Sequence, residues 1–125
     1  MVVQLSPLEF SAWSQASAAA MPGTIPVVLD VREPWELQTA SLSGEAAGLG
    51  SYRLLAVPMG DVPAQLANWQ AEWAVDQPIA CLCHHGMRSQ RVAIFLASHG
   101  FTQVVNLQGG IDAWARQVDT RVPLY

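Results

Sequence analysis

The sequence is poor in charged residues, has only two cysteines and contains no long apolar run. Charged side chains make up 13% of the 125 residues, the hydrophobic fraction is 51% and the formal net charge is −4. So little charge combined with so much apolar surface excludes an intrinsically disordered chain and predicts a full core. The length suits one globular unit, and we expect residues 1–125 to form a single domain.

The absence of basic clusters and long apolar segments excludes several kinds of partner. With a negative net charge and no cluster of basic residues, neither nucleic acid nor an anionic membrane is an expected partner. No apolar stretch approaches the length of a membrane-spanning helix. Residues Met1–Ser6 lack the basic and apolar regions of a secretion signal. We therefore expect a cytoplasmic protein, and nothing in the sequence demands more than a monomer.

The two cysteines, Cys81 and Cys83, are separated by one residue. Such a pair is no disulfide framework, since a bond between positions i and i+2 would be strained, and in a reducing compartment we expect two thiols. On a strand both side chains point to the same face. Packing in the core is the default interpretation of Cys81. The alternative is a resolving thiol that attacks an intermediate formed on Cys83.

Neither a metal site nor a cofactor site is expected. Cys81, Cys83, His84 and His85 are adjacent ligands in a short run that rarely closes a tetrahedron, and the sequence offers no second ligand pair. Gly109-Gly110 precedes a helical segment, as glycines do in phosphate loops. Because there is no lysine and no GxGxxG pattern, close backbone packing explains these glycines more economically.

Short apolar runs alternate with amphipathic segments along the chain, which predicts an α/β fold. The connections are short, so we expect a parallel sheet with helices on both faces. Strands are predicted over Val2–Leu5, Pro26–Val31, Tyr52–Val57, Ile79–Leu82 and Val104–Leu107. Helices are predicted to begin at Ser6-Pro7 with Glu9 in a capping box, to span Pro34–Ala40, to begin at Asp61, to span Ser89–His99, and to run from Gly109-Gly110 through Trp114.

The segment Cys83–Ser89 connects a predicted strand to a predicted helix. Backbone N–H groups and the positive end of the helix dipole converge at such a turn, where they bind anions and stabilise a thiolate. Four residues separate Cys83 from Arg88, so the loop can close around the thiol with its amides pointing inward, and Gly86 permits the backbone angles required. We interpret Cys83 as a nucleophile in an anion-binding loop. The alternative is a buried structural thiol.

The other polar residues of this loop have several possible roles. Arg88 either binds an anionic substrate or steadies the loop by hydrogen bonds to its carbonyl groups. His84 and His85 are expected to flank the pocket and to modulate its potential, since histidine is partly protonated near neutral pH. Met87 and Ser89 complete the candidate substrate-binding loop.

Asp30, Arg32 and Trp35 follow the second predicted strand, at the sheet edge that also carries Cys83. Asp30 and Arg32 either shape the site or form a structural ion pair with Glu33 or Glu36, and we favour the structural role. Trp35 is expected to wall the pocket.

Four segments occur in an order typical of one protein family: Asp30–Glu36, Cys83–Ser89, Gly100-Phe101 and Leu107–Trp114. On these segments the chain resembles a single-domain rhodanese, a thiosulfate sulfurtransferase, over roughly Ile25–Arg116. The resemblance implies a five-stranded parallel sheet flanked by helices and a persulfide carried on Cys83. It also implies that Cys83–Arg88 is the loop whose amides hold the sulfur, with Arg88 at its often basic last position.

One segment departs from the family pattern. Rhodanese-like proteins usually carry a short His-Ile-Pro-Gly-Ala-like turn after the Asp-Val-Arg-Glu motif. Here the corresponding stretch, Leu42–Gly50, is longer and contains neither that histidine nor that proline.

The resemblance implies a sulfurtransferase that needs no cofactor. Its expected partners are a small sulfur-containing anion such as thiosulfate, or a protein that donates a persulfide, and an acceptor such as cyanide, a thiol or a protein. One alternative is a non-catalytic rhodanese-like binding module. Another is a cysteine-dependent phosphatase or arsenate reductase; by resemblance, those loops have five residues between cysteine and arginine, whereas Cys83 and Arg88 are separated by four.

Overall fold

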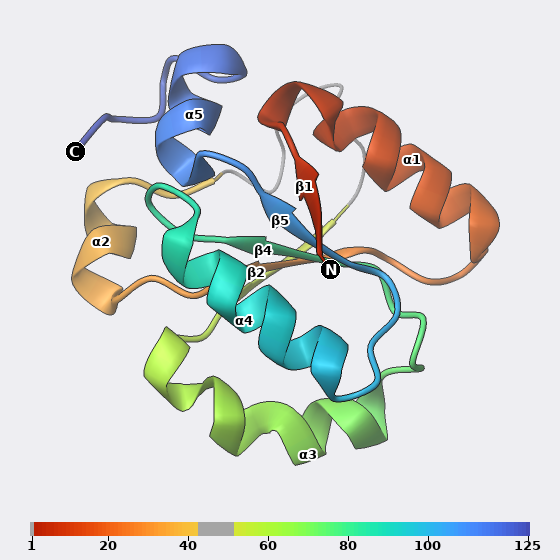
Figure 1. Ribbon diagram of the computed structural model, residues 1–125. Helices are drawn as coiled ribbons and strands as arrows, with labels where there is room; N and C mark the ends of the chain where they lie inside the picture. Colours follow the sequence, from red (N-terminus) through yellow and green to blue (C-terminus); the bar gives the residue numbers. More distant parts are fainter. Residues whose placement is uncertain (1, 43–51) are drawn as a thin grey trace.

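The protein is described by a computed structural model that covers residues 2–42 and 52–125. Within these residues five strands form one parallel sheet in the order β1-β5-β4-β2-β3 (Figure 1). The expected α/β fold and parallel sheet are therefore confirmed. The strands are β1 (Val3–Leu5), β2 (Val27–Asp30), β3 (Arg53–Ala56), β4 (Ile79–Leu82) and β5 (Val104–Leu107).

Helices cover both faces of the sheet, as expected from the alternating pattern. α3 and α4 pack on one face, and α1 and α5 on the other, while α2 follows β2 at the carboxyl edge (Figure 1). The helices are α1 (Phe10–Ala20), α2 (Pro34–Thr39), α3 (Val62–Glu72), α4 (Met87–Ser98) and α5 (Gly110–Gln117), with 3-10 turns at Pro7–Glu9 and Met59–Asp61.

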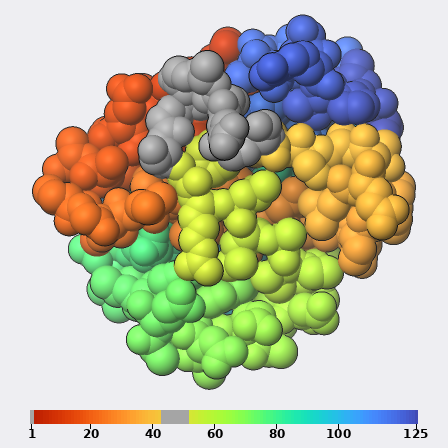
Figure 2. Space-filling model, turned by 180° about the vertical axis from the view of Figure 1, so that it is seen from behind, coloured from red at the N-terminus to blue at the C-terminus, as the bar shows by residue number. Residues whose placement is uncertain are grey.

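The core consists of two apolar layers, one on each face of the sheet. Successive side chains of a strand point to opposite faces, so Val27 and Leu29 pack against the α3 and α4 side whereas Val28 packs against the α1 and α5 side. The middle strands β5, β4 and β2 are buried along their length. β3 is an edge strand with partly exposed side chains, and residues 52–60 lie in yellow-green near the centre of the rear view (Figure 2).

One predicted helix start differs from the structure, and the predicted start of the first helix is confirmed. The helix after the cysteine loop begins at Met87 rather than Ser89, because Gly86 adopts a left-handed conformation (φ +100°) that ends the turn early and caps the helix. The first helical segment begins at Pro7 after Ser6, as a 3-10 turn. It contains the expected capping box, in which the N–H of Ser6 donates to the Glu9 carboxylate at 2.9 Å.

Two further expectations concern membrane-spanning helices and the atypical segment after the Asp-Val-Arg-Glu motif. No helix in the described ranges is both long enough and apolar enough to cross a membrane. The atypical stretch Leu42–Gly50 lies outside the described residues except for Leu42, which is buried in the α1 and α5 layer.

Candidate active site

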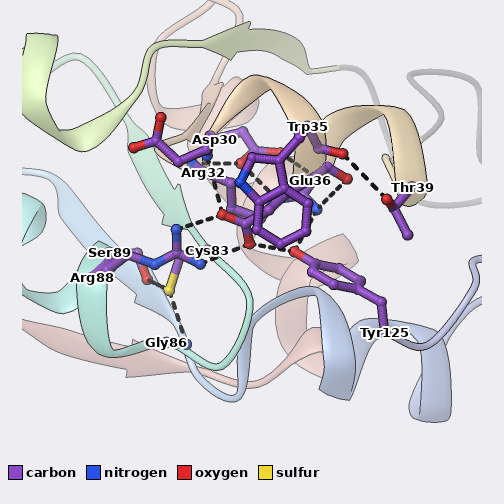
Figure 3. Close-up of polar contacts among 11 residues, drawn as sticks. Asp30, Arg32, Trp35, Glu36, Thr39, Cys83, Gly86, Arg88, Ser89 and Tyr125 are labelled. Carbon is purple, nitrogen blue, oxygen red and sulfur yellow. Dashed lines mark hydrogen bonds and ion pairs between the residues drawn. The ribbon is translucent and has the colours of Figure 1, made fainter.

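Two neighbouring strands bring the polar segments of the sequence to one edge of the sheet. β2 ends at Asp30 and β4 ends at Leu82, and the two strands pair in parallel with these residues in register. The N–H of Val31 continues the pairing by donating to the carbonyl of Leu82 at 2.9 Å. The loop that begins at Cys83 therefore lies beside the segment that follows Asp30, as the sequence predicts (Figure 3).

The thiol of Cys83 lies at the base of the loop, and two hydrogen-bond donors are within reach of its sulfur. The backbone N–H of Gly86 donates to Sγ at 3.0 Å and the Ser89 hydroxyl lies 3.3 Å from it, with Cys83 only 1% exposed (Figure 3). Both donors stabilise negative charge on sulfur. The loop was expected to offer several inward amides, and Gly86 supplies the one amide contact to Sγ found among the described hydrogen bonds.

Asn106 of β5 fixes the positions of both Ser89 and Gly86. Its side-chain oxygen accepts a hydrogen bond from Ser89 at 2.6 Å, and its amide nitrogen donates to the Gly86 carbonyl at 3.1 Å. Because a hydroxyl has one hydrogen, Ser89 donates to Asn106 or to Cys83 at any moment. Sequence reasoning missed this residue. The available signal was a polar side chain, here buried, inside an otherwise apolar strand.

The N-terminus of α5 anchors the loop from the other side. The N–H groups of Ile111 and Asp112 donate to the carbonyls of Cys83 and His84 at 2.9 and 3.1 Å. This contact needs a glycine before it, since a β-carbon on Gly110 would lie 2.4 Å from both carbonyl oxygens. The interpretation of Gly109-Gly110 as a close-packing element is confirmed.

Arg88 forms a bidentate ion pair with Glu36 of α2. Its two terminal nitrogens lie 2.6 and 2.8 Å from the two carboxylate oxygens (Figure 3). The Arg88 guanidinium lowers the pKa of Glu36 to about 2, and Glu36 in turn raises the pKa of Arg88. One role expected for Arg88 was to steady the loop by hydrogen bonds to its carbonyl groups. The guanidinium group instead binds the Glu36 carboxylate, because α2 brings Glu36 within reach of it.

Arg32 pairs with Asp30, and both side chains are fully buried. Its Nε and Nη2 atoms donate to the two Asp30 oxygens at 2.9 and 2.7 Å. The expected structural role is therefore supported, whereas the expected partners, Glu33 and Glu36, were wrong. Asp30 lies two residues away on the same strand end and satisfies the buried guanidinium directly.

Tyr125, after α5, packs onto this cluster and onto the loop. Its hydroxyl donates to Glu36 Oε2 at 2.6 Å and accepts a hydrogen bond from Arg32 Nη1 at 3.0 Å. Its ring stacks on His84 with 3.8 Å between centroids and meets Trp35 edge-on at 6.2 Å. The blue end of the chain accordingly lies against the gold α2 (Figures 2 and 3). Trp35, expected to wall the pocket, instead flanks Tyr125 and is largely exposed.

The two loop histidines stack on each other at 3.9 Å. Burial, followed by the neighbouring His85, lowers the pKa of His84, which favours its neutral form. The ligand atoms of His84, His85 and Asp112 lie within 4.8 Å of one another. Asp112 is distant in sequence, so the local pattern does not indicate this group; its carboxylate pairs with Arg116.

Cys81 is buried beside Cys83 on the α3 and α4 face of the sheet, as the strand geometry predicts. Burial and the neighbouring Cys83 both raise the pKa of its thiol. Met87, by contrast, is largely exposed at the start of α4.

Comparison with known proteins decides the family. The model of the rhodanese-like domain matches residues 14–117. This chain belongs to the rhodanese-like domain family. Its rhodanese domain is 32% identical over 96 residues to the thiosulfate sulfurtransferase GlpE of Pseudoalteromonas translucida, covering 77% of this chain and 79% of that protein.

Solved structures of other rhodanese-like proteins share the fold. The human single-domain sulfurtransferase TSTD1 superimposes with a TM-score of 0.64 at 19% identity, covering 94% of this chain and 98% of that one. A Rhodopseudomonas palustris protein described as a possible tyrosine phosphatase superimposes with a TM-score of 0.66 at 19% identity, covering 99% and 85% of the two chains. At these identities the likeness establishes the rhodanese fold alone.

Proposed function

We propose that this protein is a sulfurtransferase, folded as a single domain, that carries a sulfane sulfur as a persulfide on Cys83. The observation that carries the proposal is the position of Sγ, 3.0 Å from the Gly86 N–H and 3.3 Å from the Ser89 hydroxyl at a strand-to-helix turn. These donors stabilise the negative charge of the Cys83 thiolate, the form that attacks a sulfur donor. The family membership and the GlpE-like relative support the same chemistry.

The first half-reaction loads the cysteine. The Cys83 thiolate attacks the outer sulfur of a donor such as thiosulfate, a new S–S bond forms on the protein, and the donor S–S bond breaks. Sulfite leaves with the electron pair of the broken bond, so no oxidant or reductant is consumed.

The second half-reaction unloads the sulfur. A thiophilic acceptor, cyanide in an assay and a thiol or a protein in a cell, attacks the outer persulfide sulfur and releases the Cys83 thiolate. Two half-reactions that share a covalent intermediate predict ping-pong kinetics. The donor is a small sulfur-containing anion or a protein-borne persulfide, and the same residues serve an enzyme or a sulfur carrier.

The alternative chemistries fit the site less well. A cysteine-dependent phosphatase uses its loop arginine to bind the phosphoryl group, whereas both terminal nitrogens of Arg88 are engaged by Glu36. The loop also has four residues between Cys83 and Arg88, a smaller ring than the phosphatase loop. A non-catalytic module has no need of the Gly86 and Ser89 donors on Sγ.

The proposal is tested by thiocyanate formation from thiosulfate and cyanide. Cys83→Ser is nearly isosteric and should abolish turnover while leaving the thermal unfolding curve unchanged. Cys81→Ala is the matched control, because it removes the neighbouring thiol and leaves the loop intact. Turnover retained by Cys83→Ser would contradict the proposal.

A further inference from the structure

The carboxylate of Glu36 is fixed in place by four hydrogen-bond donors. Arg88 donates twice, the Tyr125 hydroxyl donates once at 2.6 Å, and the backbone N–H of Glu33 donates at 3.2 Å. Glu36 is only 3% exposed whereas the Arg88 side chain is 32% exposed. The buried carboxylate is therefore the fixed member of the pair, and Arg88 is held to it rather than extended toward an incoming ligand (Figure 3).

Two further arginines are compensated in the same way. Arg32, which contacts Tyr125, pairs with Asp30, and Arg116 of α5 pairs with Asp112 beside the loop. Burial lowers the pKa of His84, which favours its neutral form. Arg91, the next arginine along α4, lines an apolar cavity between α3 and α4. The hydrogen-bond donors at the Cys83 sulfur are thus neutral N–H and O–H groups, and Arg32, Arg88 and Arg116 are each paired with a carboxylate.

From this charge arrangement we infer that Glu36 sets the donor specificity of the site. By cancelling the charge of Arg88, it makes the site favour sulfane-sulfur donors that carry less negative charge than the thiosulfate dianion. The inference rests on the proposed function and names its preferred donor class. An unpaired guanidinium beside the thiol would attract a dianion more strongly than a monoanion. A neutralised pair attracts both only through dipoles and the loop amides.

Two sulfur donors that differ in charge but react through the same kind of S–S bond distinguish a site with an unpaired Arg88 from a site with a neutralised pair. Thiosulfate is a dianion that releases sulfite, and benzenethiosulfonate is a monoanion that releases benzenesulfinate. Each gives up its outer sulfur to the Cys83 thiolate as its S–S bond breaks and the leaving group takes the electron pair. Their ratio of kcat/KM for persulfide formation reports the charge of the site. Any general loosening of the loop would lower both kcat/KM values and leave their ratio unchanged, since both donors need the same loop.

The variant Glu36→Gln removes the negative charge and keeps the shape of the side chain. We expect it to raise the ratio of thiosulfate to benzenethiosulfonate kcat/KM on the order of fivefold, the effect of one added charge contact at a partly exposed site. The double variant with Arg88→Gln removes both charges and should return the ratio to the wild-type value. Glu72→Gln is the matched control, because Glu72 forms an exposed ion pair with Arg53, and the ratio should not change.

A measurement on the unmodified protein keeps the inference testable if Glu36→Gln fails to fold. Because the charges are paired, thiosulfate kcat/KM should change little between about 0.05 and about 0.5 M salt, whereas an uncompensated site would lose affinity steeply. A steep decline, or an unchanged ratio in folded Glu36→Gln, would overturn the inference and leave the persulfide chemistry standing. Failure of the wild type to form a persulfide with either donor would instead remove the proposed function, and the inference with it.

Discussion

The backbone N–H of Ile111 donates a 2.9 Å hydrogen bond to the carbonyl oxygen of Cys83. Through this bond the start of α5 fixes the backbone of the residue that we propose as the nucleophile. The bond at Asp112 to the His84 carbonyl adds a second point of attachment at 3.1 Å. Gly110 makes both possible, since its φ of +62° and its missing β-carbon let the two segments touch.

Gly110→Ala should destabilise the protein strongly. An added β-carbon would lie 2.4 Å from the carbonyl oxygens of Cys83 and His84, in a backbone conformation that alanine adopts at a cost. Overlap and strain together predict a loss of about 3 kcal/mol in unfolding free energy, measured by urea denaturation. Gly60→Ala is the control, because a β-carbon there meets nothing within 4 Å. Equal stabilities of the two variants would disprove the close-packing account.

Ser89→Ala should slow the loading of Cys83 about tenfold. The hydroxyl is one of the two donors described at Sγ, and the Gly86 N–H remains in the variant. The rate is measured by single-turnover persulfide formation. Ser98→Ala serves as control on the same helix, since Ser98 is exposed and bonds only to local groups. A Ser89→Ala rate equal to that of the control would show that the hydroxyl serves Asn106 alone.

The Glu36–Arg88 pair should stabilise the protein in a pH-dependent way. The pKa of Glu36 falls from its ordinary value of 4.5 to about 2 in the folded state, so its contribution is complete above about pH 4.5 and is lost as the pH falls toward 2. Between about pH 5 and about pH 3 the wild type should lose about 1–2 kcal/mol of unfolding free energy relative to Glu36→Gln, allowing for solvent screening of Arg88. Urea denaturation at both pH values measures this difference. A difference that stays constant would mean that the ion pair does not form in solution.

Cys81→Ala should reduce stability more than activity. Cys81 is fully buried in the α3 and α4 layer and burial raises its thiol pKa, so it remains protonated and unreactive near neutral pH. We expect a loss of about 1–2 kcal/mol of unfolding free energy from the cavity, with persulfide loading nearly unchanged. Lost turnover in a variant of wild-type stability would restore the resolving-thiol alternative.

The sequence predicts those parts of the fold that depend on local patterns. Apolar runs such as Ile79–Leu82 locate the strands, and the cysteine after that run locates the loop at the carboxyl edge. The helix start at Met87 was missed because it depends on the left-handed conformation of Gly86, which a glycine permits but does not dictate.

The partners within the site could not be predicted, because they depend on distances between segments far apart in the chain. Arg88 lies 52 positions from Glu36, and Tyr125 lies 89 positions from it. No local spacing indicates such pairs. Asn106 was missed for the same reason, since its contact with Ser89 joins β5 to α4. The partner of Arg32 was wrong for a different reason, since Asp30 lies only two residues away and satisfies the buried guanidinium in place of Glu33 or Glu36.

Intact-protein mass spectrometry after incubation with a sulfane-sulfur donor tests the central claim most directly. Wild-type protein and Cys83→Ser are each treated with thiosulfate or with benzenethiosulfonate, desalted and weighed. The account predicts a gain of one sulfur atom on the wild type alone, removed by cyanide with formation of thiocyanate. No gain on the wild type with either donor, or the same gain on Cys83→Ser, would contradict it.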